Sequence, residues 1–277
     1  MGAGKNILEE GGEFKMTITT LKKEKNKLIF TIQGINYVTA NTLRRIMTAE
    51  VPTLAVETVE FTKNMSVLYD EVIAHRIGLI PIKTDLKSYN LREECKCKGK
   101  GCAMCQLKFS LKVAGPCTVM SSELKSKDPK CTPAYPDMPI VTLEKNKKLE
   151  LTATAKLGKG KEHTKFIPGL VYYRAYPKIQ IKSCNEPEKC ARACPKKILE
   201  VKNQKLIVTR IEECDLCNAC SNACPDCITT GQEQDKFIFF IESWGQLSPK
   251  EIFLKAIIVL NKKVDEFAKD LKKSKPD

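Results

Sequence analysis

The stretch Cys214-Asp-Leu-Cys217-Asn-Ala-Cys220-Ser-Asn-Ala-Cys224-Pro225 carries four cysteines, separated by two, two and three residues. This spacing is typical of iron–sulfur proteins, in which the first three thiolates bind one cluster and the fourth binds another. The stretch therefore predicts a small module that is built around cluster ligands.

An incomplete copy of this run lies upstream, at Cys184-x5-Cys190-x3-Cys194. Pro187 stands where the second cysteine of a complete run would be. The two runs are separated by a short predicted hairpin, and together they resemble the two-cluster ferredoxin fold. We therefore expect a ferredoxin-like domain over residues 183–236.

In such an arrangement the fourth cysteine of each run binds the cluster of the other run. The complete set of ligands for one [4Fe–4S] cluster is then Cys194, Cys214, Cys217 and Cys220.

The remaining cysteines of the two runs, Cys184, Cys190 and Cys224, form a second site with three ligands. Four alternatives stay open for this site. It binds a [3Fe–4S] cluster, recruits Cys227 as a fourth ligand for a second cluster, closes a disulfide, or stays empty.

A separate cysteine group has the pattern Cys95-x-Cys97-x4-Cys102-x2-Cys105, with glycines that allow the loop to fold back. Four thiolates at this spacing suit a tetrahedral zinc ion. No histidine or carboxylate supplies an open coordination position, so this zinc would be structural. The alternative is a set of free surface thiols.

The composition restricts the class of protein. The chain has 277 residues, of which 42% are hydrophobic and 29% charged, as in ordinary globular domains. Its longest wholly apolar runs, Phe237–Ile241 and Ala256–Leu260, are too short to cross a membrane. The first residues lack the apolar stretch of a secretion signal, so we expect a cytoplasmic protein.

Fourteen cysteines in a cytoplasmic chain favour metal binding over disulfides. Two of them, Cys117 and Cys131, belong to neither group and are expected to be buried free thiols. The net charge of +14 fits either a lysine-rich solvated surface or a polyanion nearby.

The ends of the chain predict strands and helices. Alternating apolar residues at 14–19 and 28–32 indicate a hairpin, and a helical pattern at 37–50 is stopped by Pro52. Residues 51–182 are rich in predicted strands, and a last strand is expected at 237–242. The fold class is therefore α+β.

The C-terminal segment predicts a long helix that begins with a capping box, Ser248-Pro-Lys-Glu251. Apolar residues then recur at heptad spacing. This seam packs either on its own domain or on a partner subunit. Its members are Phe253, Ile257, Leu260, Val264, Phe267 and Leu271.

Four segments carry a resemblance to a known family: 41–52 (NTLRRIMTAEVP), 55–60 (AVETVE), 68–82 (LYDEVIAHRIGLIPI) and 160–168 (GKEHTKFIP). They are similar to motifs of the α-like subunits of DNA-dependent RNA polymerase. This family includes bacterial alpha, the third-largest subunit of eukaryotic RNA polymerase II and their archaeal counterpart, called D. The 95–105 loop is similar to the zinc loop of the eukaryotic counterpart, and the ferredoxin-like insertion resembles that of many archaeal members, so the chain resembles this archaeal branch with both features.

The resemblance implies a discontinuous dimerisation domain (1–51 and 237–277), an insert domain with a zinc loop (52–182) and the ferredoxin-like domain. It implies a non-catalytic subunit that pairs with the smaller α-like subunit L. With the small subunits N and P, this pair would nucleate assembly of the two large catalytic subunits, so that DNA is met only indirectly.

The same resemblance places part of the first helix and the heptad seam at subunit interfaces. The implied residues of the first helix are Leu43, Arg44, Arg45 and Met47. His75 and Arg76 lie in a motif that would face other subunits, with a core or locally paired role as the alternative for His75. Two other functions compete with this one: an independent ferredoxin-like electron-transfer protein and a DNA-binding metalloprotein.

Overall fold

The computed structural model describes residues 16–182, 184 and 186–273. The chain is a mixed α and β protein that is rich in sheet, and it divides into two compact units. The first unit takes residues up to 21, 29–40 and 173–239. The second takes residues 22–28, 41–172 and 240 onward. Each unit is described by itself.

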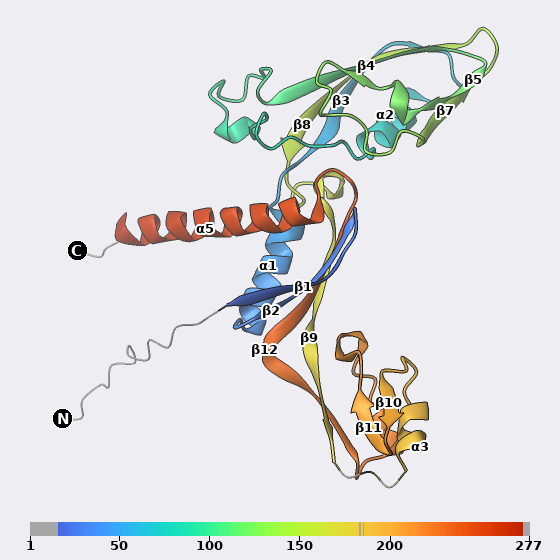
Figure 1. Ribbon diagram of the computed structural model, residues 1–277. Coiled ribbons are helices and arrows are strands. Elements are labelled where there is room, and N and C mark those ends of the chain that lie inside the picture. The colour runs from blue at the N-terminus through green and yellow to red at the C-terminus, as the bar shows by residue number, and fades with distance from the viewer. Residues whose placement is uncertain (1–15, 183, 185, 274–277) are drawn as a thin grey trace. The chain divides into compact units, whose positions relative to one another are not determined.

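One four-stranded sheet has the order β1-β2-β12-β9 (Figure 1). Its strands are β1 (Thr17–Lys23), β2 (Lys27–Gln33), β12 (Ile228–Ser243) and β9 (Gly169–Ile181). The predicted strands at 28–32 and 237–242 are confirmed. Of the strand predicted at 14–19, residues 14 and 15 lie outside the described residues. The sequence predicts that residues 169–182 belong to the insert domain. In the structure, residues 169–181 form β9, which pairs with β12 in this sheet instead.

Aromatic side chains pack on the part of this sheet that lies in the first unit. Phe237 and Phe239 are fully buried. Tyr173 contacts both of them, at ring-centroid distances of 5.7 and 5.4 Å. Phe30 stacks on Phe239 and the edge of Tyr37 meets Phe237. These contacts fix the strands that lead into and out of the cysteine-rich segment.

Two helices flank the sheet strands in sequence and match their predictions. The first, α1 (Tyr37–Ala49), ends three residues before Pro52. The second, α5 (Pro249–Lys273), begins at the predicted capping box, in which the Ser248 hydroxyl bonds the Glu251 carboxylate at 2.6 Å. The buried residues of α5 all lie near its N-terminus: Pro249, Ile252 and Ala256.

The second unit contains an antiparallel sheet in the order β3-β8-β4-β6 and a two-stranded pair β5-β7. The strands are β3 (Thr53–Asn64), β4 (Gln106–Ala114), β5 (Cys117–Met120), β6 (Lys125–Ser126), β7 (Pro139–Leu143) and β8 (Lys148–Gly158). Four prolines lie between residues 129 and 139, and β7 begins at the last of them, Pro139.

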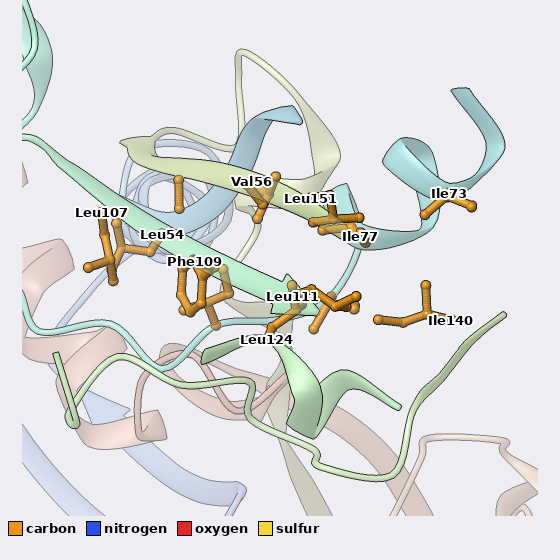
Figure 2. Packing of buried hydrophobic residues seen from close by; sticks show 14 of the residues in the cluster. Leu54, Val56, Ile73, Ile77, Leu107, Phe109, Leu111, Leu124, Ile140 and Leu151 are labelled. Carbon is orange, nitrogen blue, oxygen red and sulfur yellow. The ribbon is translucent and has the colours of Figure 1, made fainter. Parts of the chain in front are cut away.

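One helix of this unit, α2 (Asp70–Gly78), was not predicted. Ile73 and Ile77 project from one side of α2 and are fully buried in the main hydrophobic cluster (Figure 2). Phe109 and Leu111 of β4 belong to the same cluster. Short 3-10 turns complete the elements, at Arg92–Glu94, Ser121–Glu123, Thr164–Phe166 and Ile211–Glu213.

The cysteine module between β9 and β12 has two short helices and a hairpin. These are α3 (Pro187–Arg192), β10 (Leu199–Lys202), β11 (Lys205–Val208) and α4 (Ala219–Ala223). The hairpin predicted between the two cysteine runs is therefore confirmed. None of the helices in the described residues combines the length and apolar character that crossing a bilayer requires.

Replacing Phe109 by alanine tests the assignment of the insert core. Its side chain is 1% exposed, so Phe109→Ala should lower the free energy of unfolding by about 3–5 kcal/mol. The neighbouring Lys108 is exposed on the same strand, and Lys108→Ala should change stability by less than about 0.5 kcal/mol. Urea denaturation of both variants measures the difference, and equal effects would contradict the assigned core.

Candidate metal centres and interface surfaces

The four cysteines of the 95–105 loop converge in the structure. The sulfurs of Cys95 and Cys102 are 3.6 Å apart, those of Cys97 and Cys105 3.6 Å, and those of Cys102 and Cys105 3.9 Å. Four sulfurs bound tetrahedrally to one zinc ion at about 2.3 Å lie about 3.8 Å from one another. The spacing therefore fits a single tetrahedral ion.

The backbone of the loop adopts left-handed conformations that let the two cysteine pairs face each other. Lys98, Gly99 and Gly101 have φ values of 51°, 79° and 89°. Glycine takes such values without steric cost, which explains the glycines of this loop. Two hydrogen bonds, the larger effect from the Cys95 thiol and the next from the backbone N–H of Gly101, lower the pKa of Cys97 to about 6. A thiolate, the form that binds metal, is thereby favoured.

An ion pair joins this loop to α5. Lys262 of α5 contacts Glu94, the residue before Cys95, at 2.6 Å. The next residue of the helix, Lys263, contacts Glu50 at 2.7 Å, just after the end of α1. Burial opposes the charge of Glu50, but the hydrogen bond from Lys263 and the nearby Lys161 outweigh it and lower the pKa of the carboxyl. The position of α5 is thus coupled to the segment that begins the metal loop.

The four cysteines predicted to bind one iron–sulfur cluster line a common small cavity in the first unit. Cys194, Cys214 and Cys220 are buried, whereas Cys217 is exposed. Burial raises the pKa of Cys214, and the nearby Cys194 and Cys217 thiolates raise it further. The structure therefore brings together the predicted set and leaves one ligand at the surface.

The run that carries three of these cysteines has the backbone of an anion-binding turn. Leu216 and Asn218 both lie in the left-handed region, with φ values of 58° and 60°. The backbone N–H of Leu216 hydrogen-bonds the sulfur of Cys214. Such N–H groups stabilise thiolates and tune the potential of clusters that they bind.

Side chains of the four-stranded sheet hold the residues just before this run. Arg174 of β9 donates to the backbone carbonyl of Glu212, and the Tyr176 hydroxyl donates to its carboxylate at 3.1 Å. Lys236 of β12 lies over the Tyr176 ring, 3.7 Å from its centroid. Burial is the main reason why the pKa of Tyr176 is raised to about 12, and the negative charge of Glu212 adds to this effect. Glu212 therefore ties the cysteine run to β9.

The three cysteines of the predicted second site also lie together. Cys190 and Cys224 are joined by a disulfide, and the Cys184 sulfur is 3.2 Å from that of Cys190. Among the cysteines outside both predicted groups, Cys131 is fully buried, and burial raises its pKa to about 11. Cys117 is half-buried.

The predicted interface residues of α1 fall into two kinds. Leu43 and Met47 are buried within the chain, at 3% and 0% exposure, so their side chains are already covered. Arg44 is half-buried and donates twice to the side chain of Asn41, whereas Arg45 is exposed.

The predicted heptad seam of α5 changes character along the helix. Phe253, Ile257 and Leu260 are half-buried. Later in the helix, the side chains of Val264, Phe267 and Leu271 are 56%, 65% and 55% exposed. Both sequence interpretations therefore describe part of the seam, since its first half packs on the chain and its second half is exposed.

The motif at 68–82 also presents apolar side chains to solvent. Val67 and Tyr69 are each 79% exposed, beside the N-terminus of α2. His75 is exposed, so a core role for this histidine is wrong. Arg76 donates to the backbone carbonyl of Ile140 at 2.7 Å.

Comparison with known proteins identifies the family. Residues 56–168 match the family model described as the RNA polymerase Rpb3/RpoA insert domain. A DNA-directed RNA polymerase subunit Rpo3 from Methanosphaera stadtmanae is 38% identical, over 90% of this chain and 96% of its own. The chain belongs to the Rpo3 family. Rpo3 from Archaeoglobus fulgidus is 38% identical over 91% of this chain, and Rpo3 from Pyrococcus horikoshii 36% over 92%.

This family membership confirms the predicted resemblance at the level of an α-like polymerase subunit of the Rpo3 type. The matched insert segment begins in β3 and ends at Pro168, immediately before β9. An independent electron-transfer protein finds no support in these comparisons.

Removal of one loop thiol tests the metal loop. We expect Cys97→Ser to lose about one zinc ion per chain, because three thiolates no longer complete the tetrahedron. Since protons compete with the metal for thiolates, zinc affinity should also fall as the pH is lowered. Elemental analysis after dialysis measures the content, with Cys117→Ser as the matched control. Equal zinc in the two variants would contradict the assignment.

Proposed function

We propose that this chain is a non-catalytic assembly subunit of a cytoplasmic DNA-directed RNA polymerase. It pairs with the smaller α-like subunit, L, and with the small subunits N and P it bears the two large catalytic subunits. The observation that carries the proposal is the exposed apolar end of α5, in a chain that belongs to a family of polymerase subunits.

The end of α5 has the chemistry of a helix that packs on another helix. Val264, Phe267 and Leu271 recur at heptad spacing and are more than half exposed. Fully burying an apolar side chain of this size contributes about 1.5–3 kcal/mol. A partner helix that covers all three would therefore gain several kcal/mol without any rearrangement of the chain.

A second contact surface is proposed around α2. Val67, Tyr69, Val72 and Leu79 are exposed, and all lie in or beside the 68–82 motif. Large exposed apolar groups next to exposed polar ones such as His75 are typical of protein–protein contacts. We assign this surface to another polymerase subunit.

Catalysis is assigned to the large subunits. The sequence has no GxxxxGK[ST] loop for nucleotide phosphates and no Asp-rich signature for catalytic magnesium. The positive net charge alone gives little support to direct DNA binding, so the contact with DNA is proposed to be indirect.

The metal centres are proposed to support folding and assembly. The four cysteines around Cys214 suit a [4Fe–4S] cluster, and the loop at 95–105 suits zinc. Metal-binding free energy becomes folding free energy where the ligands converge only in the folded state. Glu212 and Glu94 stand next to the two sites and join them to β9 and α5 respectively.

A charge placed in the exposed seam tests the partner surface. Phe267→Asp should weaken pairing with the small α-like subunit at least about 30-fold, or roughly 2 kcal/mol, because an anchor side chain is lost. The side chain is exposed in the isolated chain, so its own stability should not change. Lys269→Asp, on another face of α5, is the control. Titration of the purified pair measures both, and equal affinities would contradict the proposal.

Loss of a cluster ligand tests the role of the cysteine module. Cys217 is exposed, so Cys217→Ser removes a ligand without leaving a packing defect. We expect the variant to lose its iron, to exchange amide hydrogens rapidly around the cysteine run at 214–224, and to assemble less well. If it assembled normally without iron, the proposed supporting role of the cluster would be rejected.

A further inference from the structure

A second convergence of thiols lies in the cysteine module. The sulfurs of Cys184, Cys190 and Cys227 all lie within 4.8 Å of one another. Cys224 is bonded to Cys190, so its sulfur lies in the same place. Three sulfurs therefore converge, and the sulfur of Cys224 is bonded to one of them.

Backbone hydrogen bonds hold Cys227 in this group. The Cys227 N–H donates to the Cys224 carbonyl at 3.2 Å and closes a turn, while the Cys227 carbonyl accepts from Lys182 N–H at 2.8 Å. The second bond ties the turn to the segment that leads into Cys184. The pair Cys224-x2-Cys227 also has the spacing of a thiolate pair in structural zinc sites.

We propose that Cys184, Cys190, Cys224 and Cys227 form a four-thiolate site for a single zinc ion. Cys227 then supplies the ligand that is missing at Pro187. The proposal depends neither on the polymerase role nor on the cluster at Cys214.

The spacing of the sulfurs favours one ion over an iron–sulfur cluster. One zinc ion requires sulfurs about 3.8 Å apart, whereas a cluster places several irons between its ligands and separates them further. Within the described residues, two groups of cysteines have all sulfurs within 4.8 Å of one another: the 95–105 loop and the trio Cys184, Cys190 and Cys227. The cysteines that line the cavity at Cys214 belong to neither group.

Metal binding at this site requires reduction of the Cys190–Cys224 disulfide. A dithiol reductant donates two electrons and two protons, becomes a disulfide itself, and leaves two thiols on the chain. The four thiols then lose their protons as zinc binds, and these protons are released to solvent. The site is therefore available to metal under reducing conditions.

Metal content of the full chain, purified without oxygen in the presence of a dithiol, tests the proposal. We expect about two zinc and about four iron per wild-type chain. Cys227→Ser should keep the iron and lose one zinc, as should Cys97→Ser at the other loop. Cys217→Ser should lose iron and keep both zinc ions, which separates this site from the cluster. Cys117→Ser is the unchanged control.

Cobalt(II) gives a readout that does not depend on counting. In a chain that carries both Cys97→Ser and Cys217→Ser, added cobalt should give the absorption of a tetrahedral thiolate complex. Adding Cys227→Ser should abolish this absorption, and Cys227→His should restore part of it, because imidazole also binds in such sites. Iron near eight per chain, zinc unchanged by Cys227→Ser, or a Cys190–Cys224 disulfide that persists in the presence of the dithiol would each overturn the proposal.

Discussion

The fold of the cysteine module depends on what its cysteines bind. Of the nine buried residues in its described core, five are cysteines, and the others are a few aliphatic side chains of the hairpin and its flanks. A core of this size and composition buries too little apolar surface to hold two short helices and a hairpin by itself. In the proposed metal-bound state, ligation adds the folding free energy that this core lacks.

Two carboxylates extend that dependence to the rest of the chain. Glu212 precedes the cluster run and contacts Tyr176 of β9, and Glu94 precedes the zinc loop and contacts Lys262 of α5. Loss of either proposed metal site would therefore disturb a contact on β9 or on α5. If these sites bind metal as proposed, this arrangement gives a physical reason for placing them in an assembly subunit.

Much of this architecture could be predicted, because cysteine spacing and capping chemistry are local signals. The C-terminal end of α1 follows from Pro52, and the start of α5 follows from the capping box at Ser248. Helix α2 was missed because its motif has only two buried residues, and its exposed apolar side chains obscure the helical period. The burial of Leu43 could not be predicted either, since an interface and a core demand the same residue type.

This chain is proposed to be a scaffold within a polymerase, and the exposed half of the seam on α5 is the surface that would contact its partner subunit. Native mass spectrometry of complexes isolated through a tag on the chain tests it most directly. We expect the isolated complex to contain one copy of the chain, one small α-like subunit and both large catalytic subunits. A metal-loaded monomer without any polymerase subunit would contradict it.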